Sequence, residues 1–411
     1  MTREVQNNTR SGPLAGLQVI EIGHFVAAPF ATRVLADLGA DVIKVEQPGS
    51  GDPARSWGAM VDGRSLWWSV HARNKRSITL NLKHSGAREV LLDLVRHADA
   101  VLENFRPGQL GAWGVGFDAM QEANPSCVLV SISGYGQTGP YRDRVSFGVI
   151  GEAIGGLRHL TGYPPEIGDL PPVRTGISLG DSIAGLYAVI GLLAAVWRRD
   201  VKSHNHRQQV DVALHEAVFS LLEGSLPEYG RLGIVRQPSG SRIPTAAPTN
   251  AYRCGDGRWL LIAGNSDRIF IRLMNLIGRP DLAQDPGLQT NNGRLERVDE
   301  LDCAISAWTA TLDSQAAGEL LDENDVPASR IYTIADCAED PHYHARGMVQ
   351  TVNDPEFGPL LHPGVVPKFS EEEMPVRWPG PALGAHNEEI YRGVLGYSAD
   401  RLERLKREGV I

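Results

Sequence analysis

Cysteine is scarce in this chain, with four residues among 411. These cysteines lie far apart and have neither the paired spacing of a zinc site nor the density of a disulfide framework. The scarcity argues against a disulfide-stabilised secreted scaffold and predicts a reducing, cytoplasmic setting. The cysteines are Cys127, Cys254, Cys303 and Cys337.

Metal-ligand spacings are also missing. Two pairs of histidines each offer two imidazoles, but no Cys, Asp or Glu stands beside them at a convincing ligand spacing. The pairs are His204 with His206 and His342 with His344. We therefore expect surface loops at both pairs and no metal site.

Positive charge is not in excess. The chain has 40 Lys and Arg against 49 Asp and Glu, a net charge of −9. Affinity for a nucleic-acid backbone needs a clustered basic excess, so a general nucleic-acid binder is excluded. Small anionic ligands stay compatible with local cations such as Lys83 and the Asn74–Arg76 stretch, although these read equally well as a solvated face.

Long hydrophobic runs are few. The first twelve residues are polar, and the longest apolar run, Ile183–Trp197, is interrupted by Gly185 and Gly191 and is short for a bilayer. We expect it to be a buried helix, with no membrane partner.

Two catalytic signatures are absent. The first predicted strand is followed by Gly23–Ala28 rather than by GxGxxG, so a dinucleotide cofactor is not supported. There is no nucleophile-elbow motif, and no Ser/His/Asp or Cys/His set can be assembled from the sequence alone.

What the chain does have is a regular alternation of strand and helix patterns. Interleaving of this kind implies right-handed βαβ crossovers and a mainly parallel, Rossmann-like sheet, that is, an α/β fold. The predicted strands are Leu17–Ile22, Asp41–Glu46, Ser77–Asn81, Ala100–Phe105, Val128–Ser133 and Gln209–Leu214, and the predicted helices are Ala28–Leu38, Ser85–His97, Phe117–Ala123 and His215–Leu226.

The character of the chain changes after residue 225. A Gly/Pro/Ser-rich passage, Ser239–Pro248, precedes a strand pair around Asp256 and Gly257 and then helices at Asp267–Ile277 and Arg294–Thr311. We predict a large domain of residues 1–225, completed by 345–411, and a smaller α+β domain of residues 226–344. The Gly- and Pro-dense stretch 135–176 predicts ordered loops around Asp181.

Asp181 stands where the long apolar helix begins, in Gly180-Asp181-Ser182. Free N–H groups and the helix dipole favour a carboxylate there, so a nucleophilic Asp of ordinary basicity can stay ionised. Asp is equally a preferred helix cap, and local physics alone favours the cap.

Ordered motifs along nearly the whole chain resemble those of the class III CoA-transferases, the family of formyl-CoA transferase and carnitine CoA-transferase. Their order matches the family from the first strand to Gly180-Asp181-Ser182. The matching blocks are Gly16–Glu21, Leu35–Glu46, Asn74–Lys83, Glu103–Gly108, Ser133–Gly136, Gly180–Ser182, Asp340–Tyr343 and Gly384–Asn387.

The resemblance implies that Asp181 is the nucleophile. The family's aspartate attacks an acyl-CoA thioester, and a mixed anhydride and then an aspartyl-CoA thioester follow. A CoA thioester is thus a substrate, the second substrate is a small carboxylic acid, and no permanently bound cofactor is expected. The family's subunits are ring-like and form an interlaced dimer, so a homodimer is expected, with a different partner subunit as an alternative.

The resemblance also implies site residues. Two groups are expected, one around CoA and one around the acyl group, with Arg242 as a partner for a distal carboxylate. The CoA group is Leu80, Lys83, Asn104, Phe105 and Arg106, and the acyl group is Val26, Ala27, Trp67 and Phe147. On burial statistics alone, Trp67 and Trp68 read as core residues rather than a substrate wall.

The chain departs from the formyl-CoA transferase pattern. Gln47 and Ala112 stand where that pattern has arginines, and Arg106, Arg73 or Arg76 are candidate replacements. The blocks Ser65–Trp68 and Gly240–Pro244 resemble instead the branch that moves CoA among succinate, malate and related dicarboxylates.

Two other functions stay open. The same fold hosts 2-methylacyl-CoA racemases, which pair the Asp with an upstream His, whereas this chain has Ser146–Val149 there. The other is a non-catalytic CoA-binding partner subunit. The acyl donor and acceptor, and the direction of transfer, are not readable from the sequence.

Overall fold

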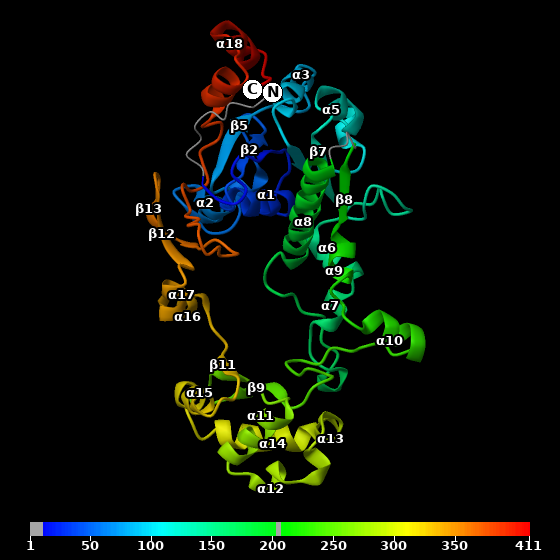
Figure 1. The fold of residues 1–411 in the computed structure, drawn as a ribbon, viewed down its shortest axis with the longest axis vertical. Helices are drawn as coiled ribbons and strands as arrows, with labels where there is room; N and C mark the ends of the chain where they lie inside the picture. Colours follow the sequence, from blue (N-terminus) through cyan, green and yellow to red (C-terminus); the bar gives the residue numbers. More distant parts are fainter. Residues whose placement is uncertain (1–10, 203–206) are drawn as a thin grey trace. The chain divides into compact units, whose positions relative to one another are not determined.

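The structure is a computed structural model that describes residues 11–202 and 207–411. The described chain divides into two compact units (Figure 1). The first unit consists of the described residues of Met1–Arg158, Arg174–Ile234 and His342–Ile411, and the second of His159–Val173 and Val235–Pro341.

The segment 159–173, which the sequence assigns to the large domain, belongs to the second unit. The Gly240 N–H donates to the Gly162 carbonyl at 3.0 Å, and His159 Nε2 bonds the Arg236 carbonyl at 3.0 Å. These hydrogen bonds tie the segment to the chain that follows residue 235.

A six-stranded sheet forms the centre of the first unit, in the order β5-β2-β1-β6-β7-β8 (Figure 1). Every neighbouring pair is parallel, which confirms the predicted α/β architecture. The strands are β1 (Gln18–Glu21), β2 (Asp41–Glu46), β5 (Lys75–Thr79), β6 (Ala100–Glu103), β7 (Val128–Ser133) and β8 (Gln209–Ala213).

Helices cover both faces of this sheet, as a parallel sheet requires. Alternate strand residues enter two cores, so that Val19 packs with α1 (Ala27–Asp37) and α8 (Leu179–Lys202), while Ile20 packs with α3 (Ala87–Val95) and α18 (Ala399–Arg407). The remaining elements outside the second unit's core are η1 (Pro53–Ser56), β3 (Met60–Val61), β4 (Arg64–Ser65), α2 (Leu66–His71), α4 (Gln109–Ala112), α5 (Phe117–Ala123), α6 (Gly148–Ile154), α7 (Leu157–Leu160), α9 (Leu214–Phe219), α10 (Ser225–Leu232), α17 (Pro341–Ala345), β12 (Val349–Asp354), β13 (Gly358–Pro363) and η4 (Glu389–Val394).

The second unit is built on a three-stranded antiparallel sheet in the order β11-β10-β9. β9 and β10 form the strand pair expected around Asp256 and Gly257, and Tyr252, Leu260 and Phe270 lie in its core. Its elements are η2 (Pro165–Ile167), β9 (Thr249–Arg253), β10 (Trp259–Ala263), α11 (Asp267–Leu276), α12 (Pro280–Ala283), η3 (Pro286–Leu288), α13 (Asn291–Glu296), α14 (Val298–Thr309), α15 (Ser314–Glu323), β11 (Ala328–Arg330) and α16 (Ile334–Glu339).

Three helix predictions differ from the structure. The stretch 135–176, predicted as loops, contains α6, α7 and η2. The helix predicted over His215–Leu226 ends at Phe219, and Pro227 lies in the first turn of α10, where a missing N–H costs little. The predicted helix Arg294–Thr311 is two helices that break at Arg297.

The apolar run after Asp181 forms α8, the one helix in the described ranges that is long and apolar enough to cross a membrane by length and composition. Its buried residues Ala184, Ala188 and Leu192 pack into the same core as α1 and the sheet. α8 is therefore a partly buried core helix, which confirms the predicted buried helix for one face only, since Ile190 and Trp197 on the other face are exposed.

Candidate active site

Asp181 is the third residue of α8 and lies in its first turn. The Ser182 N–H already donates to the Ser178 carbonyl at 3.0 Å, so the helix has begun before Asp181. Asp181 therefore lies inside α8 rather than at its N-cap, so the interpretation as a helix cap is wrong. The carboxylate is still close to the free N–H groups of the helix start.

Glycines surround this carboxylate. A Cβ built on Gly148, the first residue of α6, would fall inside the Asp181 carboxylate, with Oδ2 as the nearest atom. A Cβ on Gly180 would lie 3.0 Å from both Glu152 Cγ and the Gly148 carbonyl. The backbone of α6 thus packs directly on the Asp181 side chain.

Burial first, and then the neighbouring Glu152, raise the pKa of Asp181 to about 6, against the opposing effect of Arg174. The carboxylate is therefore mainly ionised at neutral pH but more basic than an ordinary Asp. The sequence predicts ordinary basicity. The difference comes first from burial of the carboxylate and then from Glu152, and the sequence places neither at Asp181.

An aromatic row leads away from Asp181. Phe147, the neighbour of Gly148, contacts Phe25 at 6.3 Å between ring centroids, and Phe25 contacts Trp57 at 4.9 Å. Trp57 stacks on Trp67 at 5.6 Å, and Trp67 stacks on His71 at 5.0 Å. The structure thus connects the two predicted acyl-site aromatics, Trp67 and Phe147, through Phe25 and Trp57.

The loop after β1 is held by buried side chains. Asn104 binds both backbone groups of His24 at 2.8 Å, and Asp52 Oδ1 accepts the Phe25 N–H at 3.1 Å. Burial, with Lys75 nearby, lowers the pKa of His71 to about 3, so its neutral ring donates Nε2–H to the Phe25 carbonyl at 2.7 Å. Phe25 is held at φ 62°, which a non-glycine residue seldom adopts.

This loop carries Val26 and Ala27, which are both buried at the start of α1. The Ala27 carbonyl would lie 3.0 Å from a Cβ on Gly185, one helical turn after Asp181. Two of the predicted acyl-site residues therefore belong to a segment that packs against the end of α8 that carries Asp181.

A buried ion network lies behind the loop. Lys44 Nζ contacts Glu21 at 2.5 Å and Asp52 at 2.7 Å, and Lys75 Nζ contacts Glu21 at 2.8 Å. Lys44 also donates to the Gly23 carbonyl at 3.1 Å. Sequence reasoning missed this network, although charged residues inside strongly apolar strands were an available signal.

The predicted CoA residues follow β5 and β6, whose carboxyl ends lie at one edge of the sheet, where ligands of open α/β sheets bind. Lys83 and Arg106 are exposed, and Phe105 is half-buried between His24 and Trp113. Leu80 is 1% exposed as a whole residue and packs in the core, and its N–H donates to the Glu46 carbonyl at 2.8 Å, so it presents no exposed group to a ligand.

Two candidate phosphate cations are corrected. Arg73 is 1% exposed and pairs with Asp37 at 2.7 Å, and Arg76 is 9% exposed and pairs with Asp41 at 2.5 Å. Both guanidinium groups already neutralise buried carboxylates, so they do not replace the missing cations. Arg106 is the remaining candidate of the three.

Arg242 lies in the second unit. Its guanidinium contacts Asp302 at 2.6 Å and Asp299 at 2.7 Å, and Asp302 also accepts from Tyr252 at 2.6 Å. The side chain therefore has a structural role whether or not it meets a substrate.

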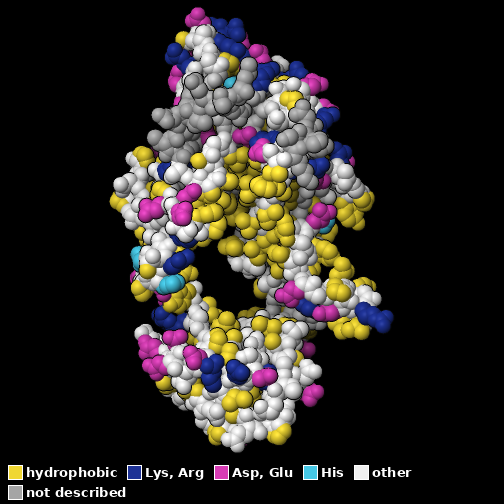
Figure 2. Space-filling model, viewed as in Figure 1, with side chains coloured by type: hydrophobic (Ala, Val, Ile, Leu, Met, Phe, Trp, Pro, Cys, Tyr) yellow, Lys and Arg dark blue, Asp and Glu magenta, His cyan; other side chains and the backbone are white. Residues whose placement is uncertain are grey.

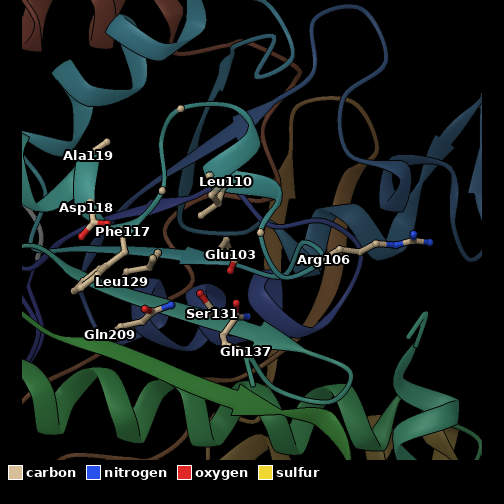
Figure 3. Close-up of a pocket in the computed structure, with 14 residues that line it drawn as sticks. Glu103, Arg106, Leu110, Phe117, Asp118, Ala119, Leu129, Ser131, Gln137 and Gln209 are labelled. Carbon is tan, nitrogen blue, oxygen red and sulfur yellow. The ribbon is translucent and has the colours of Figure 1, made fainter. Parts of the chain in front are cut away.

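A pocket of about 400 Å³ opens beside β6 and β7 (Figure 3). Glu103 and Ser131 point into it with Gln137, whereas Arg106 extends away from them. Burial raises the pKa of Glu103 to about 7, against the hydrogen bonds from Ser131 and the Phe105 N–H. Asp181 does not line this pocket.

Within the described residues, no group of three or more His, Cys, Asp or Glu side chains is placed to hold a metal ion. His342 and His344 lie on the short helix α17 rather than in the predicted loop. His204 and His206 lie outside the described residues.

Comparison with known proteins supports the resemblance seen in the ordered motifs. The model of CoA-transferase family III matches residues 14–387. Succinyl-CoA–D-citramalate CoA-transferase of Chloroflexus aurantiacus is 45% identical over 400 residues, covering 97% of this chain and 98% of that protein. Formyl-CoA:oxalate CoA-transferase of Streptomyces avermitilis is 36% identical over 416 residues, covering 97% and 99%.

Among solved structures, a CAIB/BAIF family protein from Brucella suis superposes with a TM-score of 0.81 at 32% identity, covering 94% of this chain and 100% of that one. The resemblance seen in the ordered motifs is thereby confirmed along nearly the whole length. The chain belongs to CoA-transferase family III and is a class III CoA-transferase.

Proposed function

We propose that Asp181 carries CoA as a covalent thioester between two carboxylic acids. An Asp181 oxygen attacks the thioester carbonyl carbon, the C–S bond breaks, and a mixed anhydride and CoA thiolate form. The thiolate attacks the aspartyl carbonyl and releases the donor acid. The acceptor carboxylate then reverses both steps, which yields acceptor-CoA and restores the Asp181 carboxylate.

The observation that carries this proposal is the packing of α6 on Asp181. The carboxylate is partly buried, mainly ionised at neutral pH and flanked by glycine backbone, which lets N–H groups approach a developing oxyanion. The anhydride and thioester survive only where water is kept out, and the row Phe147, Phe25, Trp57 offers an apolar wall on that side.

For substrates, we propose succinyl-CoA as donor and a dicarboxylate as acceptor. The support is the likeness to relatives whose names give succinyl-CoA with D-citramalate or L-malate, at 45% and 37% identity. Arg242 is the proposed partner for a distal carboxylate, in competition with Asp299 and Asp302. Lys83, Asn104, Phe105 and Arg106 are the proposed CoA contacts.

We also propose a cytoplasmic homodimer. The exposed apolar side chains on α8 support it, because a monomer rarely leaves such a stripe in water. The racemase alternative needs a second base beside Asp181. The residue packed on its carboxylate is Gly148, which has no side chain, and the nearby Glu152 carboxylate already accepts from the Gly180 N–H and Arg158.

The test is mass spectrometry of the protein after incubation with succinyl-CoA. We expect a covalent CoA adduct on the peptide that contains Asp181, removable by hydroxylamine. Asp181→Ala should abolish both adduct and transfer while the protein stays folded, since Ala favours a helix and the lost carboxylate is costly to ionise in the folded chain.

Three outcomes separate the functions. Exchange of an α-hydrogen of a 2-methylacyl-CoA with deuterated water and no adduct would indicate a racemase. Neither adduct nor exchange, with Asp181→Ala unchanged in CoA binding, would indicate a binding subunit. An adduct that only formyl or aryl acceptors discharge would remove the dicarboxylate assignment alone.

A further inference from the structure

Glu152 is a buried carboxylate beside the nucleophile that takes no part in the covalent steps. It lies on α6 and is 1% exposed. Its Oε1 accepts the N–H of Gly180, the residue before Asp181, at 3.1 Å. Its Oε2 accepts from the Arg158 guanidinium at 3.0 Å. The carboxylate thus joins the first turn of α8 to a cation on α7.

The packing fixes this arrangement. Gly180 has no Cβ, and one placed there would lie 3.0 Å from Glu152 Cγ, so the two backbones approach as closely as glycine permits. A buried carboxylate without a partner is costly, and Arg158 supplies the partner while remaining 25% exposed itself.

Other charges around Asp181 are few in the described part of the chain. Arg174, in the segment before α8, is the cation that acts on it. α1 presents the apolar Ala27 and Phe30 to this end of α8, and His215 of α9 is turned to the Gly134 carbonyl at 3.1 Å. Glu152 is therefore the one anion that acts on the Asp181 carboxylate among these neighbours.

We propose that the Glu152–Arg158 pair is a positioning device that anchors the first turn of α8 and keeps a negative charge beside Asp181, which makes that carboxylate a stronger nucleophile. The inference rests on the proposed role of Asp181 as the attacking group. Acylation removes the charge of Asp181, so repulsion from Glu152 is present before the attack and relieved after it. An interaction that weakens as the reaction proceeds in this way lowers the barrier to acylation. Glu152 also raises the pKa of Asp181, as this placement requires.

Two variants move the charge in opposite directions. Glu152→Gln keeps an amide oxygen for the Gly180 N–H and removes the anion. Arg158→Gln keeps the anion and removes its cation. We expect the acid limb of the pH profile of kcat/KM to move down by roughly one unit in Glu152→Gln and up in Arg158→Gln. The rate of adduct formation at pH 8 should fall several-fold in Glu152→Gln, because nucleophilic reactivity follows basicity.

The measurement is the rate of adduct formation with succinyl-CoA, followed by rapid quench and mass spectrometry between pH 5 and 9. A wild-type adduct together with an unmoved acid limb in Glu152→Gln would overturn the inference and leave the proposed function intact. Absence of an adduct in the wild type would instead overturn the proposed function. If Glu152→Gln does not fold, an unmoved limb in Arg158→Gln overturns the inference equally.

Discussion

At the scale of single residues, the environment of Asp181 lowers the stability of the folded protein and raises the basicity of this carboxylate. Its carboxyl group has a pKa of about 6 in the folded chain, against an ordinary value of 3.8. A raised carboxyl pKa means that the folded state holds the proton more tightly than the unfolded state does. Ionising Asp181 therefore costs folding free energy, and this cost is nil below the ordinary pKa and complete above pH 6.

Asp181→Asn should consequently stabilise the protein at pH 8 and leave it unchanged near pH 3.5. The pKa difference allows a gain of about 1–3 kcal/mol in the free energy of unfolding. Urea denaturation at the two pH values measures it. Asp143→Asn is the matched control, since it removes the same charge from a side chain that is 82% exposed. Equal stability of Asp181→Asn and wild type at pH 8 would contradict the raised pKa.

The sequence singled out Asp181, the proposed nucleophile, but not its neighbours. The motif around Gly180 and the start of an apolar helix pointed to Asp181. Glu152 was missed because its stretch read as loop. Arg73 and Arg76 were wrong as phosphate ligands, because a cation in a strand pattern looks the same whether it faces water or a buried carboxylate. Only the fold brings Asp37 and Asp41 beside them.

At the scale of elements, α8 is positioned by two close approaches. A Cβ on Gly185 would lie 2.8 Å from Phe30 Cδ1 of α1, and a Cβ on Gly191 would lie 2.6 Å from Val210 Cγ1 of β8. Both glycines let the helix approach its neighbour. Gly185 is one turn from Asp181, and Gly191 is nearly three turns away.

Gly185→Val and Gly191→Val form a matched pair. Each overfills a tight contact and should lower the free energy of unfolding by about 1–3 kcal/mol. Gly185→Val should also lower kcat by roughly tenfold or more at a temperature where both variants are folded, because displacing the start of α8 from Ala27 misplaces the nucleophile. Similar kcat values for the two folded variants would refute this role of the α1–α8 contact.

Elements with a clear period were predicted well. Asp41–Glu46, Phe117–Ala123 and Val128–Ser133 have the predicted bounds in the structure. α6 was missed because its glycines resemble a loop. In the structure they allow close packing, since a Cβ on Gly151 or Gly155 would lie 2.8 Å from the side chain of Leu214 or Val218 of α9.

At the scale of the whole molecule, the sequence patterns predicted the α/β class and a separate antiparallel part. They did not predict that the segment 159–173 belongs to that part, because the hydrogen bonds of Gly162 with Gly240 and of His159 with Arg236 form only in the folded chain. The patterns also did not reveal which apolar residues stay in water. On α8, one face stays exposed, and Figure 2 shows hydrophobic side chains gathered where Figure 1 places this helix.

This exposed face is a regular stripe. Leu186, Ile190, Trp197 and Val201 recur at helical spacing and are 46%, 61%, 68% and 54% exposed. The opposite face of the same helix lies in the core, so the stripe is the outward side of an element that the unit already holds. A second copy of the chain is the occupant we propose for it.

Ile190→Asp with Trp197→Asp should therefore weaken the dimer. Burying two carboxylates from each protomer in an apolar interface should cost several kcal/mol, and we expect the dimer Kd to rise by roughly 100-fold or more. Sedimentation equilibrium at micromolar concentration measures the change. Leu361→Asp is the control, because Leu361 is 62% exposed but lies on β13, away from α8 in the first unit (Figure 1). A wild-type monomer, or a double variant that dimerises as tightly as the control, would contradict the proposal that a second copy of the chain covers this stripe.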